Sequence, residues 1–206
     1  MLTAFDALTH AIEGYCCKGK NALSDRYSIL AINNIINYLP SVLSEDKNLD
    51  INLAYLKLLE AATYAGVSFS NSMVGSVHAI AHAVGSYLKV GHDFAVANLL
   101  PFVLKFNLDK SYKEYALLYD IFVDKKIKLG VMDKAVKFIE FICEFYRQNA
   151  MKIGGILTLK DCGMKKEDFD IIANLALSDG AILTNPKCMS YNNIVDILTM
   201  VWENNL

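Results

Sequence analysis

Residues 72–85 read SMVGSVHAIAHAVG and lie inside the longest uncharged stretch of the chain, which runs from Ala61 to Leu88. The apolar residues recur with helical periodicity, and the alanine-rich face of the segment indicates close packing against other helices. The stretch also contains three glycines, several serines and two histidines, and such polar groups are costly in lipid unless they are paired. We therefore interpret it as the buried core of a globular domain rather than as a membrane span.

Helical periodicity continues along most of the chain. After the candidate N-cap Ser24, an apolar stripe predicts a helix that ends at Pro40. Further helices are predicted over residues 53–67, 72–85, 112–123, 133–149, 165–177 and 190–203. Only short segments, such as residues 155–159, have any strand character. Because a chain of 206 residues can bury a sizeable core, the sequence predicts one all-α, multi-helix domain over residues 1–206.

The composition excludes several classes of protein. With 20 basic and 22 acidic residues, the net charge of −2 gives no support for a nucleic-acid or membrane partner. The N-terminus lacks the basic and apolar segments of a signal peptide. The five cysteines lack C-x-x-C spacing, which disfavours a disulfide framework or a zinc ribbon and is typical of a cytoplasmic protein. A mean hydropathy of +0.28 is high for a domain that stands alone and indicates an apolar face covered by a partner.

The histidines carry the clearest chemical signal. Asp6 and His10 are four residues apart, as are His78 and His82, so each pair shares one face of a predicted helix. His92 follows after two glycines that can end the helix and turn the chain back. A carboxylate and several imidazoles that converge from separate helices are what a first-row divalent metal needs. A histidine on an apolar helix is usually a hydrogen-bonded core residue, so the spacing alone leaves both roles open.

Two hydrolytic chemistries can be compared with this pattern. Residues 78–82 have the H-x-x-x-H frame of a zinc protease, but Ala79 occupies the position of the catalytic glutamate, which excludes that activity. The pair His92-Asp93 is compatible with an all-α phosphohydrolase of the HD-domain type. Candidates for the remaining ligands of such an enzyme are His78, His82, Asp109 and Asp120. The chain has no G-x-G-x-x-G or G-x-x-x-x-G-K-[ST] motif, so it contains no recognisable phosphate-binding loop.

Several motifs together resemble the iron-containing (group III) alcohol dehydrogenases. Residues 5–15, FDALTHAIEGY, are similar to the D-A-L-T-H-A-I-E signature of that family. Residues 77–85, VHAIAHAVG, followed by His92 and Leu100-Pro101, resemble its second signature in composition and spacing. Residues 161–165 (DCGMK) and Asn185-Pro186 look like the tail of the same domain. The resemblance covers essentially the whole chain and implies the C-terminal, helical, metal-binding domain of the family, with a dehydroquinate synthase-like fold.

The resemblance also implies a role for individual residues. The family's metal ligands fall on Asp6, His10, His78 and His92, which would bind Fe²⁺, with Zn²⁺ as the alternative ion. His82 matches the histidine that faces the nicotinamide and the substrate, although a supporting hydrogen bond is its alternative role. Phe69 falls at an aromatic wall near the substrate, and a core position is equally compatible with it. The implied reaction is hydride transfer between NAD(P) and a short-chain alcohol or aldehyde whose oxygen the iron polarises.

Two departures from the family's pattern affect the expected function. Asp93 stands where the family normally has a glycine after the last histidine ligand, so its side chain could crowd the metal. Family members also carry a nucleotide-binding half before the D-A-L-T-H motif, and this chain begins at Met1, so NAD(P) is expected to bind only with a nucleotide-binding domain. Three functions stay open: a dehydrogenase half that is inactive alone, an inactive remnant or assembly domain that docks another domain or a second copy, and the HD-type hydrolase.

Overall fold

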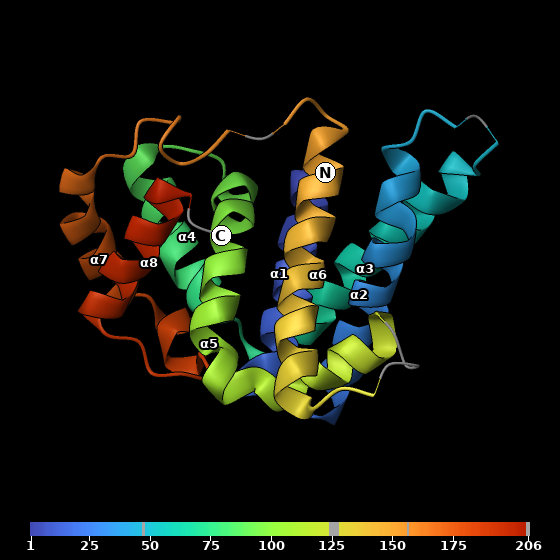
Figure 1. Cartoon of the computed structure of the whole chain (residues 1–206), viewed down its shortest axis with the longest axis horizontal. Coiled ribbons are helices and arrows are strands. Elements are labelled where there is room, and N and C mark those ends of the chain that lie inside the picture. The colour runs from blue at the N-terminus through green and yellow to red at the C-terminus, as the bar shows by residue number, and fades with distance from the viewer. Residues whose placement is uncertain (47, 124–127, 156, 205–206) are drawn as a thin grey trace.

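The computed structural model describes residues 1–46, 48–123, 128–155 and 157–204. The regular secondary structure of these residues is helical (Figure 1). The helices are α1 (Leu2–Cys16), α2 (Ala22–Val42), α3 (Ile51–Ser72), α4 (Ser76–Leu88), α5 (His92–Phe122), α6 (Val131–Met151), η1 (Lys166–Asp168), α7 (Phe169–Leu177), η2 (Gly180–Thr184) and α8 (Tyr191–Glu203). No strand occurs in the described ranges, and the predicted all-α fold is confirmed. Residues 155 and 157–159 form no strand either, and Ile156 lies outside the described residues.

Helix α5 lies in the middle of the arrangement. It packs against α1, α4, α6 and α8, while α4 packs on α7 and α7 on α8. On the other side, α2 and α3 pack against each other and against α1. Figure 1 shows α7 and α8 at one end of the molecule and α2 and α3 at the other, with α1 and α5 between them. The two groups of helices are therefore connected mainly through α1 and α5.

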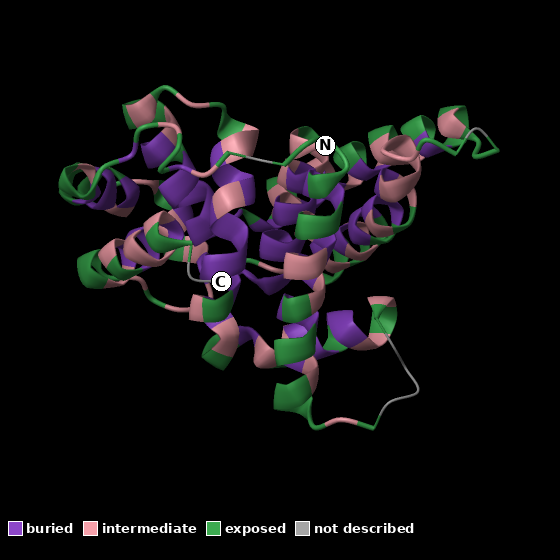
Figure 2. Cartoon of the chain, turned by 45° about the horizontal axis from the view of Figure 1, so that its top comes forward, coloured by how far each residue is buried: buried purple, intermediate pink, exposed green. Residues whose placement is uncertain are grey.

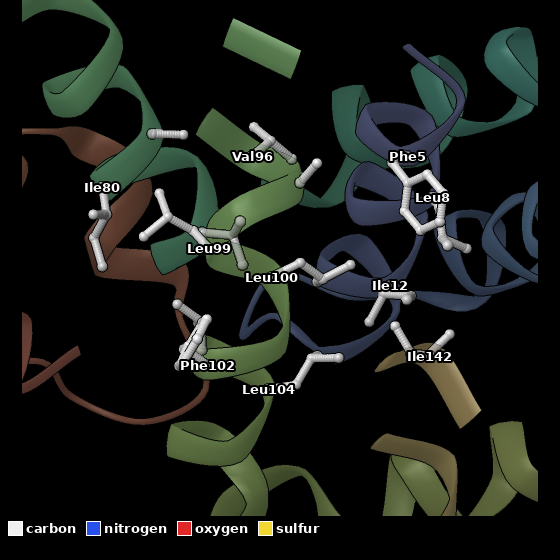
Figure 3. Packing of buried hydrophobic residues seen from close by; sticks show 14 of the residues in the cluster. Phe5, Leu8, Ile12, Ile80, Val96, Leu99, Leu100, Phe102, Leu104 and Ile142 are labelled. Atoms are coloured by element: carbon white, nitrogen blue, oxygen red, sulfur yellow. The ribbon is translucent and has the colours of Figure 1, made fainter. Parts of the chain in front are cut away.

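The apolar core joins these two groups through side chains of α5. Leu99 and Leu100 are almost completely buried and lie between Ile80 of α4 and Ile12 of α1 (Figure 3). Figure 2 shows that buried residues are concentrated on the helices at the centre of the molecule. Full burial of one such side chain contributes about 1.5–3 kcal/mol. These contacts fix the position of α1 relative to α4, the two helices that carry most of the predicted metal ligands.

Helix α2 differs from the sequence prediction at both ends. Its N-cap is Asn21, whose side chain accepts hydrogen bonds from the backbone N–H groups of Leu23 and Ser24. Ser24 completes a capping box, because its hydroxyl accepts from the N–H of Asn21. The prediction that Pro40 ends the helix is wrong, since α2 continues to Val42. Proline lacks an N–H donor and its ring crowds the carbonyl four residues earlier, but only two residues of α2 follow it, so few helical hydrogen bonds are affected.

The predicted boundaries around α4 and α5 are also corrected. Helix α4 begins at Ser76 and passes through Gly85, which was expected to end it. It ends instead at Leu88, where Lys89 adopts the left-handed conformation with φ of 58°. Helix α5 begins at His92, so the helix predicted over residues 112–123 is only its last third. An isolated glycine weakens a helix by about 1 kcal/mol, which packing of the alanine-rich face readily offsets.

The surface explains part of the high mean hydropathy. None of the described helices is both long and apolar enough to cross a membrane. Helix α3 nevertheless exposes Tyr55, Leu56 and Leu59, each more than half accessible to solvent. That a partner covers such an apolar face stays a prediction.

Leu99→Ala should lower the free energy of unfolding by about 2–5 kcal/mol, because it removes a fully buried side chain between α1 and α4. Leu59→Ala is the matched control, since Leu59 is 68% exposed and its truncation should change stability by less than about 0.5 kcal/mol. Urea denaturation followed by circular dichroism measures both variants. Equal losses would contradict the central role of α5 in the core.

Candidate metal centre

Three helices bring the predicted ligands together. Asp6 and His10 lie one turn apart on α1, His78 lies in the first turn of α4, and His92 is the first residue of α5. The short connection between α4 and α5 turns sharply, because Lys89 is left-handed and Gly91 is the N-cap of α5. This turn returns the chain to the beginning of α4. Local sequence therefore sets the spacing within each helix, and the packing of α1, α4 and α5 sets the spacing between them.

Asp6, His78 and His92 offer ligand atoms that all lie within 4.8 Å of one another. The Asp6 Oδ1 atom is 3.5 Å from the Nε2 atom of His78 and 3.5 Å from the Nε2 atom of His92. Two ligand atoms bound to the same tetrahedral metal at about 2.0–2.2 Å are themselves roughly 3.4 Å apart. The observed separations therefore fit atoms that share one cation.

Two of these atoms make no hydrogen bond within the part of the chain that the structure describes. Asp6 Oδ1 and His78 Nε2 are buried, and neither finds a hydrogen bond among the described residues. An unsatisfied buried polar atom costs about 1–3 kcal/mol, and native structures contain few of them. A cation between these two atoms would satisfy both, so the donor set fits a divalent metal.

His10 lies beside this group of three. Its Nδ1 atom is 3.0 Å from the backbone oxygen of Asp6, and because a carbonyl can only accept, the Nδ1–H donates and Nε2 keeps its lone pair. The ring of His10 lies 4.1 Å from that of His78 and 4.5 Å from that of Phe69, measured between centroids. Phe69, on α3, is half-buried and thus forms one wall of the site, next to a predicted ligand.

His82 lies one turn after His78 and faces a different partner. Its Nδ1 atom is 2.7 Å from Oδ2 of Asp179, and its side chain is about half exposed. The ring stacks on that of His92 with a centroid distance of 5.1 Å. A cavity of about 230 Å³ adjoins it, lined by His82, Ala83, Ser86, Leu175, Ser178 and Asp179. His82 therefore lies at the open side of the group, whereas His78 lies at its buried side.

Sequence reasoning missed three polar residues around the site. Glu13 on α1 is buried and accepts hydrogen bonds from the first turn of α4, including one from His78. Its position seven residues after Asp6, on the same helix face, was the available signal. Asn185 accepts from the backbone N–H of Ser76, and Asp179 holds His82. No sequence signal connects these last two residues with α4, because they lie about 100 positions further along the chain.

The charges of the site act on one another. Burial raises the pKa of the Asp6 carboxyl, but the imidazoles of His78, His10 and His92 outweigh it and hold the pKa below its usual value. For His10, burial and the neighbouring His78 imidazole lower the pKa to about 4. For His78 itself, burial lowers the pKa, but the carboxylates of Asp6 and Glu13 outweigh it and raise the pKa to about 9. The field that holds a proton on His78 would equally stabilise a metal cation in its place.

Asp93 lies next to His92 but outside the group of three. Its carboxylate accepts a hydrogen bond from the backbone N–H of Phe94 at 2.9 Å, in the first turn of α5. The same carboxylate lies beside Gly91, where a Cβ added to the glycine would be 3.1 Å from Oδ1 of Asp93. The ligand role that an HD-type hydrolase requires of Asp93 therefore has no counterpart in this geometry.

A larger cavity lies apart from the metal centre. It has a volume of about 790 Å³ and lies between α5 and α6, where Lys105, Cys143 and Arg147 are among its lining residues. None of the predicted site residues lines it. Size alone would favour this cavity as the functional site, but the converging ligand atoms lie outside it, and His82, which stacks on His92, lines the smaller cavity.

Comparison with known proteins identifies the family. Residues 1–202 match the C-terminal part of the Fe-containing alcohol dehydrogenase family. The chain belongs to this family. It is 35% identical over 187 residues to the 1,3-propanediol dehydrogenase of Klebsiella pneumoniae, a match that covers 90% of this chain and 46% of that protein. It is 32% identical over 200 residues to the lactaldehyde reductase of Escherichia coli strain K12, covering 97% of this chain and 50% of that protein.

The solved structures agree with this assignment. The crystal structure of a 1,3-propanediol oxidoreductase superimposes with a TM-score of 0.87 at 32% identity, covering 97% of this chain and 50% of that one. The expected family and its helical C-terminal fold are both confirmed. The chain spans about half the length of the curated relatives it matches.

Gly75→Ala should destabilise the protein by about 1–3 kcal/mol, because the added Cβ would lie 2.9 Å from both Glu13 Oε1 and Asn185 Oδ1 and would break buried hydrogen bonds. Gly66→Ala makes the same chemical change inside α3, where nothing lies within 4 Å, and should stabilise the protein by about 0.5–1 kcal/mol. Urea denaturation of both variants measures the difference. Opposite signs are expected, and equal effects would contradict the close packing at the start of α4.

Proposed function

We propose that this chain is the metal-binding half of an iron-dependent, NAD(P)-linked alcohol dehydrogenase or aldehyde reductase. The observation that carries the proposal is the buried pair Asp6 Oδ1 and His78 Nε2, which lie 3.5 Å apart and make no hydrogen bond among the described residues. The Nε2 atom of His92 completes the group from a third helix. Family membership supports the interconversion of an alcohol and an aldehyde, as the names of the relatives indicate.

Four side chains would hold the metal. Asp6 supplies a carboxylate oxygen, and His78 and His92 supply imidazole nitrogens that already converge on it. His10 would be the fourth ligand through its Nε2 lone pair, since its Nδ1–H is engaged by the Asp6 carbonyl. When bound, Fe²⁺ would act as a Lewis acid that stabilises negative charge on the substrate oxygen, and Zn²⁺ would supply the same chemistry. Three imidazoles and one carboxylate suit either ion.

Two further side chains would act on the substrate. Because Asp179 holds the Nδ1 atom of His82, the Nε2 atom of this half-exposed ring is available to the substrate and to solvent. His82 would orient the substrate hydroxyl and exchange a proton with water at Nε2. Phe69, whose ring lies beside that of His10, would cover the carbon chain of the substrate and exclude water from it.

The nicotinamide would be held by another part of the enzyme. Hydride transfer needs the nicotinamide ring about 3–3.5 Å from the reacting carbon. Such a position depends on a pyrophosphate-binding loop, and the chain has no glycine-rich motif of that kind. A nucleotide-binding domain that docks on this chain would supply it.

Removing a proposed ligand should remove the metal. We expect about one divalent ion per purified chain, lost in His78→Ala and in His92→Ala because each variant deletes a converging nitrogen. His82→Ala is the matched control: it removes an imidazole from the same helix face, and its metal affinity should fall by no more than about 10–100-fold. Elemental analysis after gel filtration measures the content. Stoichiometric metal in both ligand variants would overturn the assignment, and loss in His82→Ala alone would exchange the roles of the two α4 histidines.

The chain alone should bind NAD⁺ or NADH weakly and should not oxidise short primary alcohols. Isothermal titration calorimetry with both nucleotides and an NADH-linked aldehyde assay measure this. Adding the nucleotide-binding half of a related dehydrogenase should restore nucleotide binding and turnover. Robust turnover by the chain alone would show that the nucleotide site lies within these residues. Absence of turnover in the reconstituted, metal-loaded mixture would favour an inactive assembly domain, and Asp93→Gly would then test whether Asp93 is the cause.

A further inference from the structure

Glu13 is a buried carboxylate that the proposed chemistry does not use. It lies on α1, two turns after Asp6, and is only 6% exposed. Its Oε1 atom accepts the backbone N–H of Val77 at 2.7 Å. Its Oε2 atom accepts the backbone N–H of Gly75 at 2.9 Å and is 2.6 Å from Nδ1 of His78. One side chain therefore binds both the N-terminal end of α4 and the imidazole that α4 carries toward the metal centre.

These contacts determine which nitrogen of His78 is free. A carboxylate oxygen that already accepts a backbone N–H can only accept again, so the Nδ1 atom of His78 carries a hydrogen and donates it. In the neutral ring, the form that binds a metal, the lone pair of His78 is then on Nε2, the atom that lies 3.5 Å from Asp6 Oδ1. The ring has little freedom to turn, because His78 is almost fully buried and packs against the rings of His10 and His92.

We propose that Glu13 is a positioning residue for the metal centre: it fixes the tautomer and the ring orientation of His78 so that Nε2 faces the metal. The inference rests on the metal site proposed above. A carboxylate on the outer nitrogen of a metal-binding histidine also makes the ring a more basic ligand. Glu13 lies on α1, the helix that supplies Asp6, so its hydrogen bonds fix the position of His78 on α4 relative to Asp6 on α1.

A comparison with Asn185 distinguishes the positioning of His78 from the anchoring of the α4 backbone, because the hydrogen bond that Asn185 accepts from α4 comes from the backbone. Its Oδ1 atom accepts the backbone N–H of Ser76 at 3.2 Å, and its side chain exchanges two hydrogen bonds with that of Asn107. It is fully buried and holds the same helix end as Glu13, since the side-chain oxygens of both residues lie 2.9 Å from the position of a Cβ added to Gly75. Its hydrogen bonds do not include His78. Asn185→Ala is therefore a matched control that loosens the start of α4 and leaves the histidine with its carboxylate.

The test uses Co²⁺ as the probe metal, because its visible absorption reports the ligands and their geometry. Metal affinity is measured by competition with a chelator for the wild-type chain, Glu13→Gln, Glu13→Asp and Asn185→Ala, with denaturation curves recorded for each. We expect Glu13→Gln to weaken Co²⁺ binding by about 10–100-fold and to change the visible spectrum. Glu13→Asp, which keeps the charge but is one methylene shorter, should fall between Glu13→Gln and the wild type. Asn185→Ala should lose stability but keep the wild-type spectrum and an affinity within about threefold.

A second measurement keeps the test decisive if Glu13→Gln does not fold. Nitrogen-15 NMR of the histidine rings in the metal-free chain reports the tautomer when it is recorded above the His78 pKa of about 9, where the ring is neutral. His78 should then carry its hydrogen on Nδ1 in the wild type and in Asn185→Ala. In Glu13→Asp this tautomer preference should weaken. Unchanged affinity and spectrum in the Glu13 variants, or an equal loss in Asn185→Ala, would overturn the positioning role. A wild-type chain that binds no Co²⁺ would instead overturn the proposed metal centre, and the inference with it.

Discussion

The hydrogen bonds between Glu13 and the first turn of α4 are the interaction on which the rest of the site depends. The first N–H groups of a helix have no partner within the helix, and here a buried carboxylate from α1 accepts those of Gly75 and Val77. The same carboxylate engages His78. A buried carboxylate is stable only when its oxygens are hydrogen-bonded, and here the two backbone N–H groups and His78 supply those hydrogen bonds. The relative position of α1 and α4 is thereby fixed at the point where the proposed ligands meet.

Helix α5 supplies the third residue of the group, His92. Its N-terminal residue His92 reaches the site, while Leu99 and Leu100, two turns further along, bury themselves between α1 and α4. A helix is rigid over such a distance, so apolar packing in the core and ligand placement at the end of α5 are set together. The polar interactions select the orientation of each side chain, and the apolar core supplies most of the free energy that keeps the helices in place.

Much of the candidate site could be predicted from spacing and resemblance. The intervals between Asp6 and His10 and between His78 and His82 are properties of a helix, and they survive in the structure. Helix ends were predicted less well: α2 passes Pro40 and α4 passes Gly85, because packing outweighs a single local breaker. The partners of the two α4 histidines could not be predicted, since contacts between residues 65 and 97 positions apart leave no periodic trace in the sequence.

The amino-acid sequence was sufficient to predict that this protein is helical, which faces its helices bury, and which side chains have the chemistry of metal ligands. These properties follow from the period of the α-helix and from the chemistry of carboxylate and imidazole. The folded chain was needed to show that His78 directs Nε2 toward Asp6 whereas His82 turns toward Asp179. The reason is physical: the two nitrogens of an imidazole are equivalent in ligand chemistry until a hydrogen-bond acceptor occupies one of them. For His78 that acceptor lies 65 residues earlier in the chain, and only folding brings it there.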